Sequence, residues 1–544
     1  MPSAPLLPLL PSGTLPPLAV LLRWLEDLRL DQVDAIVAEI LPPLNGSLPD
    51  VLRLGGITTL LTTGQPAANF RWEGFGGNRL TVAELPPEPE MLIEALHRGD
   101  LPAGPARFAD DHGLLSLVDV ARLEDASACL GIGTGAAWHR VLTTVDRTRA
   151  PRMPVLVART IEDGALGAWN PLPFARWLVV SLPSTSKPWA LVDSHGRQSP
   201  VQIVEGLEGP ELLTCVELGA LEAVTLRAVD EPVADVLWEV EEQVLDNGLV
   251  RAEFDSLGQV TRLCWRGLFA ELVGPAVAPR LNGENLGSSA TISVLEAGPV
   301  RARLCVVRSA AAGVLRITYT LHAHDDGLRV AVAWSPHPDH ADAELEFDHP
   351  TAHRGCHVHL AGELCRSTLP QAYSLSEPAM APHGGVRWAT LGDAAGRGLA
   401  IVAGRAVVVS ALGGVLKVHG APTAYALYAA RHAGANLGQL ALALATPGRA
   451  TALEAPVPAP FHLAELGGLV PLWARRPAEW AGEVCFSEQR QSRGRAWLFP
   501  QEKPQEAWRV DAAGHGLAKV NLTREGDGVE IDHLPGEILI IRWR

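Results

Sequence analysis

The feature that most limits the fold is a long series of short apolar runs beginning near residue 152. Gly, Pro, Asp or Ser bound these runs, and many of the runs alternate apolar with polar residues. Such alternation is typical of antiparallel strands with one buried face. The runs are PVLVART (154–160), RWLVVSL (176–182), WALVDS (189–194), VQIVEG (201–206), LLTCVEL (212–218), AVTLRAV (223–229) and EILIIRW (537–543).

One β-hairpin stands out within this series. The segment 247–267, NGLVRAEFDSLGQVTRLCWRG, contains two alternating runs joined by Asp255–Gly258. A Gly-containing connection of this length between two such runs predicts a tight turn between antiparallel strands. Because strand signals continue to the last residues, we expect β-sandwich structure through 161–544.

The first part of the chain has a different pattern. Apolar residues recur at helical spacing from Leu18 to Ile40, with a break near Leu30–Asp31, and predict helix there. Ile57–Thr63 is β-branched and apolar, as in a buried strand, and Arg79–Ala83 is a second short strand. Further helices are predicted at Pro89–Leu96 and Leu114–Cys129.

A short helix is predicted between the loop 41–46 and the first of these strands. Pro42 and Pro43 disfavour helix before them, Ser47 is a capping residue, and Pro49 fits a first helical turn. Gly55–Gly56 then lead the chain out of the helix and into the strand.

These patterns predict an α+β multidomain protein. Residues 1–100 would form a partial α/β region, barrel-like but incomplete, and residues 101–160 a short helical region. The remainder, 161–544, would form a large antiparallel β-super-sandwich made of middle and C-terminal domains.

Charge and hydropathy exclude several classes of protein. The net charge is −16, and the 45 Lys and Arg residues are dispersed, which argues against a nucleic-acid surface. No apolar run approaches the ~18 residues that span a bilayer, so no membrane role is expected. The start lacks a basic residue before Arg23, unlike a secretory signal, so the expected location is the cytoplasm. The scarcity of lysine favours a bacterial source with a GC-rich genome.

Cysteine and histidine clusters offer little specific chemistry. The 7 cysteines include no CxxC pair, which favours reduced, mostly buried thiols. Zinc remains an alternative for the segment 349–365, HPTAHRGCHVHLAGELC, although strand alternation places His357 and His359 on the face opposite Cys356. The simpler interpretation is a polar strand face. HAHDDG (322–327) is interpreted as a hairpin turn. GIGTGAAWHR (131–140) lacks the Lys-Ser/Thr of a phosphate loop.

Five segments in consistent order carry a family resemblance. They are GAWNPLPFARWLVVSL (167–182), VLDNGLVRAEFDSLGQVTRL (244–263), LRVAVAWSPH (328–337), HLAGELCRST (359–368) and VRWATLGDAAGRGLAIV (386–402). Together they resemble the middle and C-terminal β-domains of glycoside hydrolase family 38, the α-mannosidases. The resemblance spans about 165–450.

The resemblance extends into the N-terminal part, but it departs from the family at positions of chemistry. LPSGT (10–14) is similar to a Pro-Ser-Gly-Glu loop, with Thr14 at the acid's place. FRWEGFGGNRLTV (70–82) resembles a Trp-x-Gly-x-Asp-Gly turn, with Gly76 at the aspartate's place. WHRVLTT (138–144) is similar to a His-Arg-Gly-Thr segment, which would make His139 a surviving metal ligand.

The loop 41–46, LPPLNG, matches the family loop Leu-Pro-Asp-x-Phe-Gly that presents the nucleophilic aspartate. Pro43 occupies the nucleophile's position. Asp50 is a weak substitute, since LPDV imitates the motif. Its simpler role is to stabilise the N-terminus of the helix that follows.

The family also places a His-x-Asp zinc motif before the Pro-Ser-Gly loop, and this sequence begins at that loop. The resemblance therefore implies an N-terminally truncated, catalytically degenerate relative, unless the start of the sequence omits an upstream segment. A catalytic zinc needs about three protein ligands, so no cofactor is expected, and zinc only if a site is completed.

Three hypotheses for function follow. The leading one is a family 38-like protein that binds α-mannosides or a related glycan without hydrolysing them, with Trp72, Trp138 and Arg366 as sugar contacts. The second is an active α-mannosidase with a rebuilt or partner-completed site. The third is a non-catalytic structural or interaction subunit. A partial barrel exposes sheet edges, so a homo-oligomer or a partner subunit is expected to cover them.

Overall fold

The computed structural model spans all 544 residues and describes most of the β-rich part and seven short stretches nearer the N-terminus. The described residues are 9–10, 35–38, 48–54, 56–57, 59–62, 70–73, 79–84, 166–183, 190–205, 210–229, 238–265, 271–286, 289–340, 344–350, 357–361, 366–370, 379–392, 397–412, 414–421, 423–431, 435–446, 448–452, 456, 458–464, 469–477, 479–488, 493–511 and 514–544.

The chain divides into two compact units. One comprises 1–155, 363–366 and 463–544, and the other comprises 156–362 and 367–462. The predicted boundaries near residues 100 and 160 fall outside the described residues.

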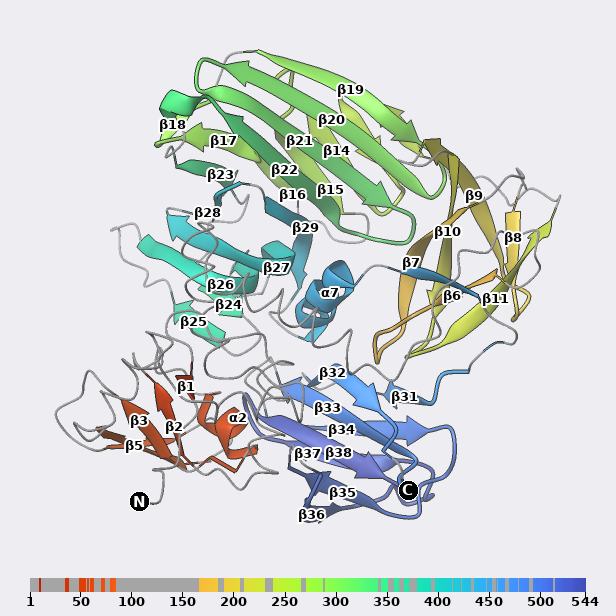
Figure 1. The fold of residues 1–544 in the computed structure, drawn as a ribbon. Helices are drawn as coiled ribbons and strands as arrows, with labels where there is room; N and C mark the ends of the chain where they lie inside the picture. The colour runs from red at the N-terminus through yellow and green to blue at the C-terminus, as the bar shows by residue number, and fades with distance from the viewer. Residues whose placement is uncertain are drawn as a thin grey trace, which may run out of the picture. The chain divides into compact units, whose positions relative to one another are not determined.

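The N-terminal strands form a mainly parallel sheet, drawn in red in Figure 1. Its order is β1-β2-β3-β5-β4; the first four strands are parallel, and β4 is antiparallel to β5. The α/β character predicted for this region is confirmed. The bounds are β1 Leu9–Leu10, β2 Ala35–Ala38, β3 Thr59–Thr62, β4 Phe70–Glu73 and β5 Arg79–Glu84.

One prediction for this region is wrong. The helical spacing that runs to Ile40 predicted helix across 35–38, whereas these residues form β2. Their sequence, Ala-Ile-Val-Ala, lies between two parallel neighbours, with Ile36 opposite Leu60 and Val37 opposite Leu9. A short apolar run is compatible with either element, and here pairing on both sides decides for the strand.

The predicted short helix is present as α2, Leu48–Leu54. The Gly56 N–H donates to the Arg53 carbonyl at 2.9 Å, and the Ile57 N–H donates to the Leu52 carbonyl at 3.0 Å. Gly56 has a φ of 78°, so this is a Schellman end, which requires a left-handed residue that glycine supplies. Leu52 and Ile57 are both fully buried beside this end. The predicted exit from the helix is confirmed at Gly56, and Gly55 lies outside the described residues.

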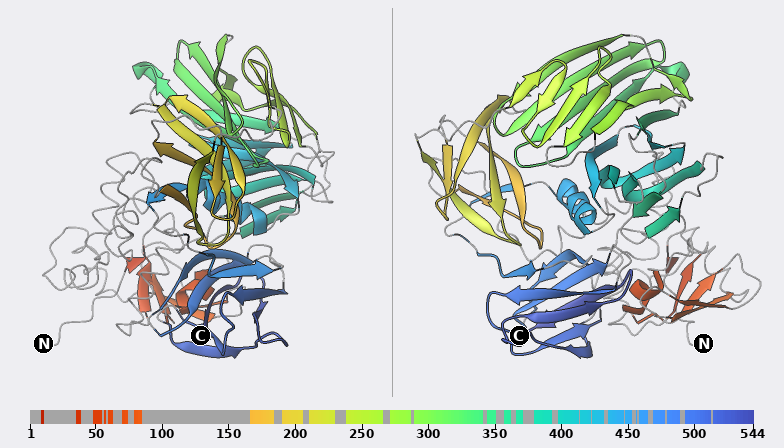
Figure 2. Two further views of the ribbon diagram at one scale, coloured as in Figure 1. Left: turned by 90° about the vertical axis from the view of Figure 1, so that its right-hand side faces the viewer. Right: turned by 180° about the vertical axis from the view of Figure 1, so that it is seen from behind.

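In the second unit, seven strands make a nearly closed antiparallel sheet; β6 to β11 are drawn in yellow tones in Figure 2, and β30, from later in the chain, in blue. Its order is β30-β6-β11-β8-β9-β10-β7, and the two end strands approach one another. Leu178, Leu191, Leu212 and Val224 fill its interior. The bounds are β6 Leu166–Trp169, β7 Arg176–Pro183, β8 Ala190–Asp193, β9 Gln198–Glu205, β10 Pro210–Leu218, β11 Ala223–Val229 and β30 Arg449–Ala452.

The predicted sandwich follows, and it is the largest part of the same unit (Figures 1 and 2). A five-stranded sheet, β12-β13-β14-β15-β16, packs on a thirteen-stranded sheet that contains β17 to β29. Their shared core includes Leu263, Ile317, Phe347 and Val409. The first sheet consists of β12 Glu239–Glu241, β13 Val244–Asp246, β14 Val250–Phe254, β15 Val260–Trp265 and β16 Glu271–Ala276.

The thirteen-stranded sheet is antiparallel in the pairings described, and helix α7, Ala435–Ala445, packs on its strand β27. Its strands are β17 Ala278–Leu281, β18 Glu284–Asn285, β19 Ala290–Ala297, β20 Arg301–Ala310, β21 Gly313–His322, β22 Leu328–Pro336, β23 Leu345–Pro350, β24 His357–Ala361, β25 Arg366–Pro370, β26 Ala379–Gly392, β27 Arg397–Leu412, β28 Val415–His419 and β29 Thr423–Arg431. A short 3₁₀ helix, Pro338–His340, follows β22.

The predicted hairpin is confirmed as β14 and β15. Its turn is held by the Asp255 carboxylate, which accepts the N–H groups of Leu257 at 2.9 Å and Gln259 at 2.8 Å. Gly258 has a φ of 71°, and an added Cβ would lie 2.5 Å from Val306 side-chain atoms. Glycine is therefore required at this turn for both its φ angle and its size.

Helices long and apolar enough to cross a membrane are lacking in the described portions of the chain.

The strands within 461–544 are antiparallel in the pairings described. They form the sheets β31-β34-β37 and β32-β33-β38-β35-β36. The strands are β31 Phe461–Ala464, β32 Leu469–Arg475, β33 Gly482–Glu488, β34 Gly494–Pro500, β35 Ala507–Val510, β36 Gly516–Val520, β37 Val529–His533 and β38 Ile538–Trp543. The predicted fold class, a partial α/β region followed by extensive β-sandwich, is confirmed.

Candidate functional site

The carboxyl edge of the N-terminal parallel sheet is the candidate site. The last residues of its four parallel strands are in register, with Leu10 opposite Ala38, Ala38 opposite Thr62, and Thr62 opposite Glu84. Ligands of open α/β sheets bind at the carboxyl ends of the strands. In the sequence, the LPSGT segment continues directly from this row, and Pro43 follows Ala38 by five residues.

The structure describes three of the six residues singled out from the sequence. Asp50 lies in the first turn of α2, Trp72 lies in β4 opposite Leu80, and Arg366 is the first residue of β25. Pro43, Trp138 and His139 lie outside the described residues. Whether Asp50, Trp72 and Arg366 share one site stays a prediction.

Asp50 is a buried helix residue, with 1% of its surface exposed. It has an interaction partner within the fold. A carboxylate in a first turn is stabilised by the positive end of the helix dipole. This is the position expected if Asp50 stabilises the helix N-terminus, which is the simpler of its two predicted roles; the other is to replace the nucleophile.

The residues described in the parallel sheet and α2 do not fit a catalytic zinc. They include the acids Asp50, Glu73 and Glu84, and among them neither histidine nor cysteine occurs. Glu73 is an exposed residue whose carboxylate accepts a hydrogen bond from Arg79 at 2.9 Å. A catalytic zinc needs about three protein ligands converging on one point, so no zinc chemistry is derived for this edge.

Glu84 is a residue that the sequence analysis missed. It ends β5 and so lies in the row that forms the carboxyl edge. The sequence did indicate Glu84, because an acidic residue at the carboxyl end of a buried parallel strand is a typical site residue.

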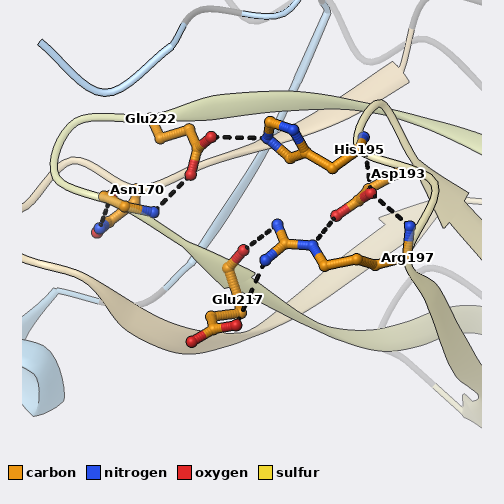
Figure 3. A network of polar contacts seen from close by, with 7 residues as sticks. Asn170, Asp193, His195, Arg197, Glu217 and Glu222 are labelled. Carbon is orange, nitrogen blue, oxygen red and sulfur yellow. Dashed lines mark hydrogen bonds and ion pairs between the residues drawn. The ribbon is translucent and has the colours of Figure 1, made fainter. Parts of the chain in front are cut away.

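A polar network in the seven-stranded sheet was also missed (Figure 3). Asp193, at the end of β8, accepts the N–H groups of His195 and Arg197, both at 2.9 Å, and the Arg197 Nε at 2.8 Å. Arg197 also donates to the Glu217 carbonyl at 2.7 Å. This set closes the β8–β9 turn and connects it to β10.

Glu222 continues the network on the other side of His195. Its Oε1 lies 2.8 Å from His195 Nε2, and its Oε2 accepts the Gly219 N–H at 2.6 Å. The buried carboxylate of Asp193 and the partly buried carboxylate of Glu222 already have hydrogen-bond partners, so neither is a spare general base. The arrangement fastens turns rather than forming an acid–base pair (Figure 3).

Asn170 belongs to the first segment of the family resemblance and is fully buried. Its Nδ2 donates to the carbonyls of Phe174 at 2.8 Å and Gly219 at 2.7 Å. Its Oδ1 accepts from the Leu172 N–H at 3.1 Å and the Arg176 Nε at 2.9 Å. The side chain therefore uses its whole hydrogen-bonding capacity to shape the backbone that enters β7.

Asn247, in the second segment of the resemblance, has an equivalent set of bonds. Its Nδ2 donates to the carbonyls of His322 and Asp325, both at 2.8 Å. Its Oδ1 accepts the N–H groups of Leu249 at 3.0 Å and Val250 at 2.9 Å. The two turns that it joins are 75 residues or more apart. Asn247 is thus a structural residue of the sandwich.

The segment HAHDDG forms the predicted turn between β21 and β22 and carries a charged cluster. The Asp325 carboxylate accepts from Arg329 at 2.7 Å, the Tyr428 hydroxyl at 3.0 Å and the Gly327 N–H at 3.0 Å. His324 has a φ of 59° and stacks on Trp177 with ring centroids 3.7 Å apart. The bonds to Asp325 all run within the fold, so this cluster fixes the turn.

His349 is a core histidine. Nδ1 lies 3.3 Å from the Leu416 carbonyl, and Nε2 lies 2.9 Å from the Tyr425 hydroxyl. Burial lowers its pKa to about 4, so the ring is neutral at pH 7. With a proton on Nδ1, the ring donates to the carbonyl and accepts from the hydroxyl. Of the other histidines and cysteines in the sequence segment 349–365, His357 and His359 lie in β24, and His353, Cys356 and Cys365 fall outside the described residues.

The described cysteines are free thiols, as predicted: Cys215, Cys264, Cys305 and Cys485. Burial raises the pKa of the Cys215 thiol to about 12. That thiol is therefore protonated at neutral pH and is not a nucleophile.

Comparison with solved protein structures shows which fold this chain has. No protein-family model matches the sequence, and no curated protein matches it. A solved protein of glycosyl hydrolase family 38 from Enterococcus faecalis matches with a TM-score of 0.65 and 10% identity, over 99% of this chain and 90% of that chain. An α-mannosidase from Enterococcus faecalis V583 matches with a TM-score of 0.63 and 10% identity, over 97% and 90%. This chain has their fold.

The family 38-like, α-mannosidase-like fold expected from the resemblance is thereby confirmed. At 10% identity the likeness concerns the fold and not the chemistry. Catalytic degeneracy and a shortened N-terminal part stay predictions.

Proposed function

We propose that the chain is a family 38-related protein of carbohydrate metabolism that binds α-mannosides or a related glycan and does not hydrolyse them. The observation that carries the proposal is the α-mannosidase-like fold, matched over 99% of this chain with a TM-score of 0.65. The parallel sheet of that fold supplies a carboxyl edge of the type at which ligands bind.

Loss of hydrolysis is argued from the chemistry of the positions involved. Retaining glycoside hydrolysis needs two carboxyl groups about 5 Å apart on either side of the bond. By resemblance, Pro43 stands where the attacking aspartate would be, and proline has no ionisable group. Asp50, the weak substitute, is buried in a helix turn. A lone His139 would not hold a catalytic zinc.

Glycan contact is assigned to Trp72, Trp138 and Arg366. Tryptophan rings stack on the apolar faces of sugars, and guanidinium groups donate paired hydrogen bonds to sugar hydroxyls. Of these, Trp72 lies in β4, next to β5 in the parallel sheet. It is therefore the first residue to test.

Binding is measured by isothermal titration of the purified chain with methyl α-mannoside and with α-linked mannose oligosaccharides. We expect binding of the α-mannosides, none of methyl β-glucoside, and an affinity at least about tenfold weaker in Trp72→Ala. Trp177→Ala is the matched control. Trp177 is 42% exposed and stacks on His324, and both residues belong to the unit that does not contain Trp72. Absence of binding at millimolar sugar, or equal losses in both variants, contradicts the assignment.

A second candidate is an α-mannosidase with a rebuilt site, and the position of Glu84 favours it. Glu84 is the acidic residue in the carboxyl-edge row. Turnover of an aryl α-mannoside that is lost in Glu84→Gln and kept in Glu73→Gln would establish this alternative. Absence of turnover in the wild type removes it.

The sheet also has edges that bear on assembly. Within the described residues, β1 and β4 end the sheet on its two sides. We expect a homo-oligomer or a partner subunit to cover one of them, since an open edge pairs readily with another strand. Such a partner could equally complete a catalytic site or make the chain a purely structural subunit. Gel filtration with light scattering, followed by turnover assays on any complex, separates these outcomes.

A further inference from the structure

Three potential metal ligands meet on one face of the thirteen-stranded sheet, at the junction of β23 and β28. Glu346 in β23 and His419 in β28 are direct register partners, so their side chains lie on the same face of the sheet. Glu344, two residues before Glu346, shares that face by strand alternation. The intervening Leu345 and the flanking Phe347 belong to the core on the opposite face. Figure 1 shows the two strands side by side.

The three side chains converge. His419 Nδ1 lies 3.5 Å from Glu346 Oε1 and 3.9 Å from Glu344 Oε1, and the three ligand atoms all lie within 4.8 Å of one another. Glu344 is held by its backbone, because its N–H donates to Asn282 Oδ1 at 2.9 Å and its carbonyl accepts the Asn282 N–H at 2.8 Å. The cluster is therefore preformed.

His419 supplies an independent indication of a ligand. Its side chain is only 8% exposed, yet Nδ1 has no hydrogen-bond partner among the described residues. The other ring nitrogen, Nε2, lies 2.7 Å from the Ser410 hydroxyl. When Nε2 carries the proton and donates to Ser410, Nδ1 presents a lone pair to the carboxylates. A metal-binding histidine is oriented in this way by a bond from its other nitrogen.

The distances favour a shared cation over a direct hydrogen bond. A proton between Nδ1 and a carboxylate would bring the two heavy atoms to about 2.7–2.9 Å. Two ligands of one tetrahedral zinc ion, each about 2.1 Å from the metal, lie roughly 3.4 Å apart. The observed 3.5 and 3.9 Å are close to the second value.

We propose that Glu344, Glu346 and His419 form a zinc-binding site on the face of the β-sandwich. One imidazole nitrogen and two carboxylate oxygens suit this ion, and water completes the coordination on the side of Glu344, whose side chain is 69% exposed. The proposal does not depend on the proposed glycan function, since its three residues belong to the second unit and the parallel sheet belongs to the first.

Neighbouring charges set the strength of the site. Lys417 Nζ lies 2.7 Å from Glu346 Oε2 and 3.7 Å from Asp348 Oδ1, so it orients Glu346 and leaves Oε1 for the metal. Arg280 occupies Asp348 at 2.7 Å. The ammonium of Lys417 also repels a cation, which weakens binding relative to a site without it.

The test is isothermal titration of the full, chelator-treated chain with zinc chloride. We expect His419→Ala and Glu346→Gln each to bind one zinc ion fewer per chain than the wild type. Because buried substitutions can affect folding, Glu344→Gln provides the second variant: its exposed side chain leaves the thermal midpoint unchanged while zinc affinity falls at least about tenfold.

His195→Ala is the matched control, because His195 lies 2.8 Å from Glu222 and, among the described residues, this pair belongs to no group of three potential metal ligands. We expect it to bind zinc as the wild type does. An anomalous-scattering map at the zinc edge should place the ion between His419 Nδ1 and the two carboxylates. Wild-type protein that binds no zinc, or variants that keep the full stoichiometry and affinity, would overturn the proposal.

Discussion

The N-terminal parallel sheet and the antiparallel sheets of the second unit, here called the β-body, differ in the role of the motifs that resemble family 38. In the β-body, the motif residues Asn170 and Asn247 each make four hydrogen bonds that shape turns. In the N-terminal part, the resemblance predicts that Pro43, Thr14 and Gly76 stand where family 38 has acids. Turn-shaping residues are required by folding whatever the chemistry, whereas catalytic residues are required only by the reaction.

The largest effect on stability is expected from Asn247→Ala. The variant loses four hydrogen bonds, two of them to the part-buried carbonyls of His322 and Asp325. We expect the free energy of unfolding of the β-body to fall by about 3 kcal/mol, measured by urea denaturation.

Asn285→Ala is the matched control for this variant. Asn285 is exposed in the short strand β18, so its truncation should change stability by less than about 0.5 kcal/mol. Equal effects of the two variants would show that Asn247 does not shape the framework, and the comparison between the two regions would fail.

A pH-dependent effect of nearly this size is expected from His349. Its folded-state pKa is about 4, below the ordinary histidine value of 6.5, because burial disfavours the charged ring. The folded state then binds fewer protons than the unfolded state, so this contribution is complete above pH 6.5 and is lost as the pH falls toward 4. We expect about 2–3 kcal/mol of stability to be lost between pH 7 and 4.5 on this account.

The contribution is isolated by comparing the wild type with His349→Gln. The variant should be less stable at pH 7, but its stability should fall less between pH 7 and 4.5. Parallel pH profiles for the two proteins would contradict a neutral core histidine.

The smallest effect is expected in the N-terminal part, from Asp50→Ala. Loss of a carboxylate from the first turn of α2 should cost about 1 kcal/mol of stability. Affinity for α-mannosides should stay unchanged, because Asp50 is buried and not a sugar contact. A loss of sugar binding or turnover with unchanged stability would instead support Asp50 as a substitute for the nucleophile.

Much of the fold could be predicted from the sequence because the strands alternate and the turns carry marked residues. The turn at Asp255–Gly258 and the helix end at Gly56 were each indicated by local sequence. Strand β2 was not, because Ala-Ile-Val-Ala is too short for periodicity to separate helix from strand, and pairing with β3 decided it.

The cluster of Glu344, Glu346 and His419 shows why sites are harder to predict than folds. Glu346 and His419 lie 73 positions apart, and only the register of β23 against β28 makes them neighbours. Register in a large sheet depends on long-range packing that no local motif encodes. The predicted site residues of the N-terminal part came from the resemblance, and their roles stay predictions.

The central proposal is that this protein has an α-mannosidase-like fold but does not hydrolyse α-mannosides. The most direct test is turnover of an aryl α-mannoside by the full chain in saturating zinc, with His419→Ala assayed in parallel so that metal at the β-sandwich site does not confuse the result. The account predicts no turnover above the uncatalysed rate in either protein. Turnover that is abolished by a chelator, restored by zinc and retained in His419→Ala would contradict it.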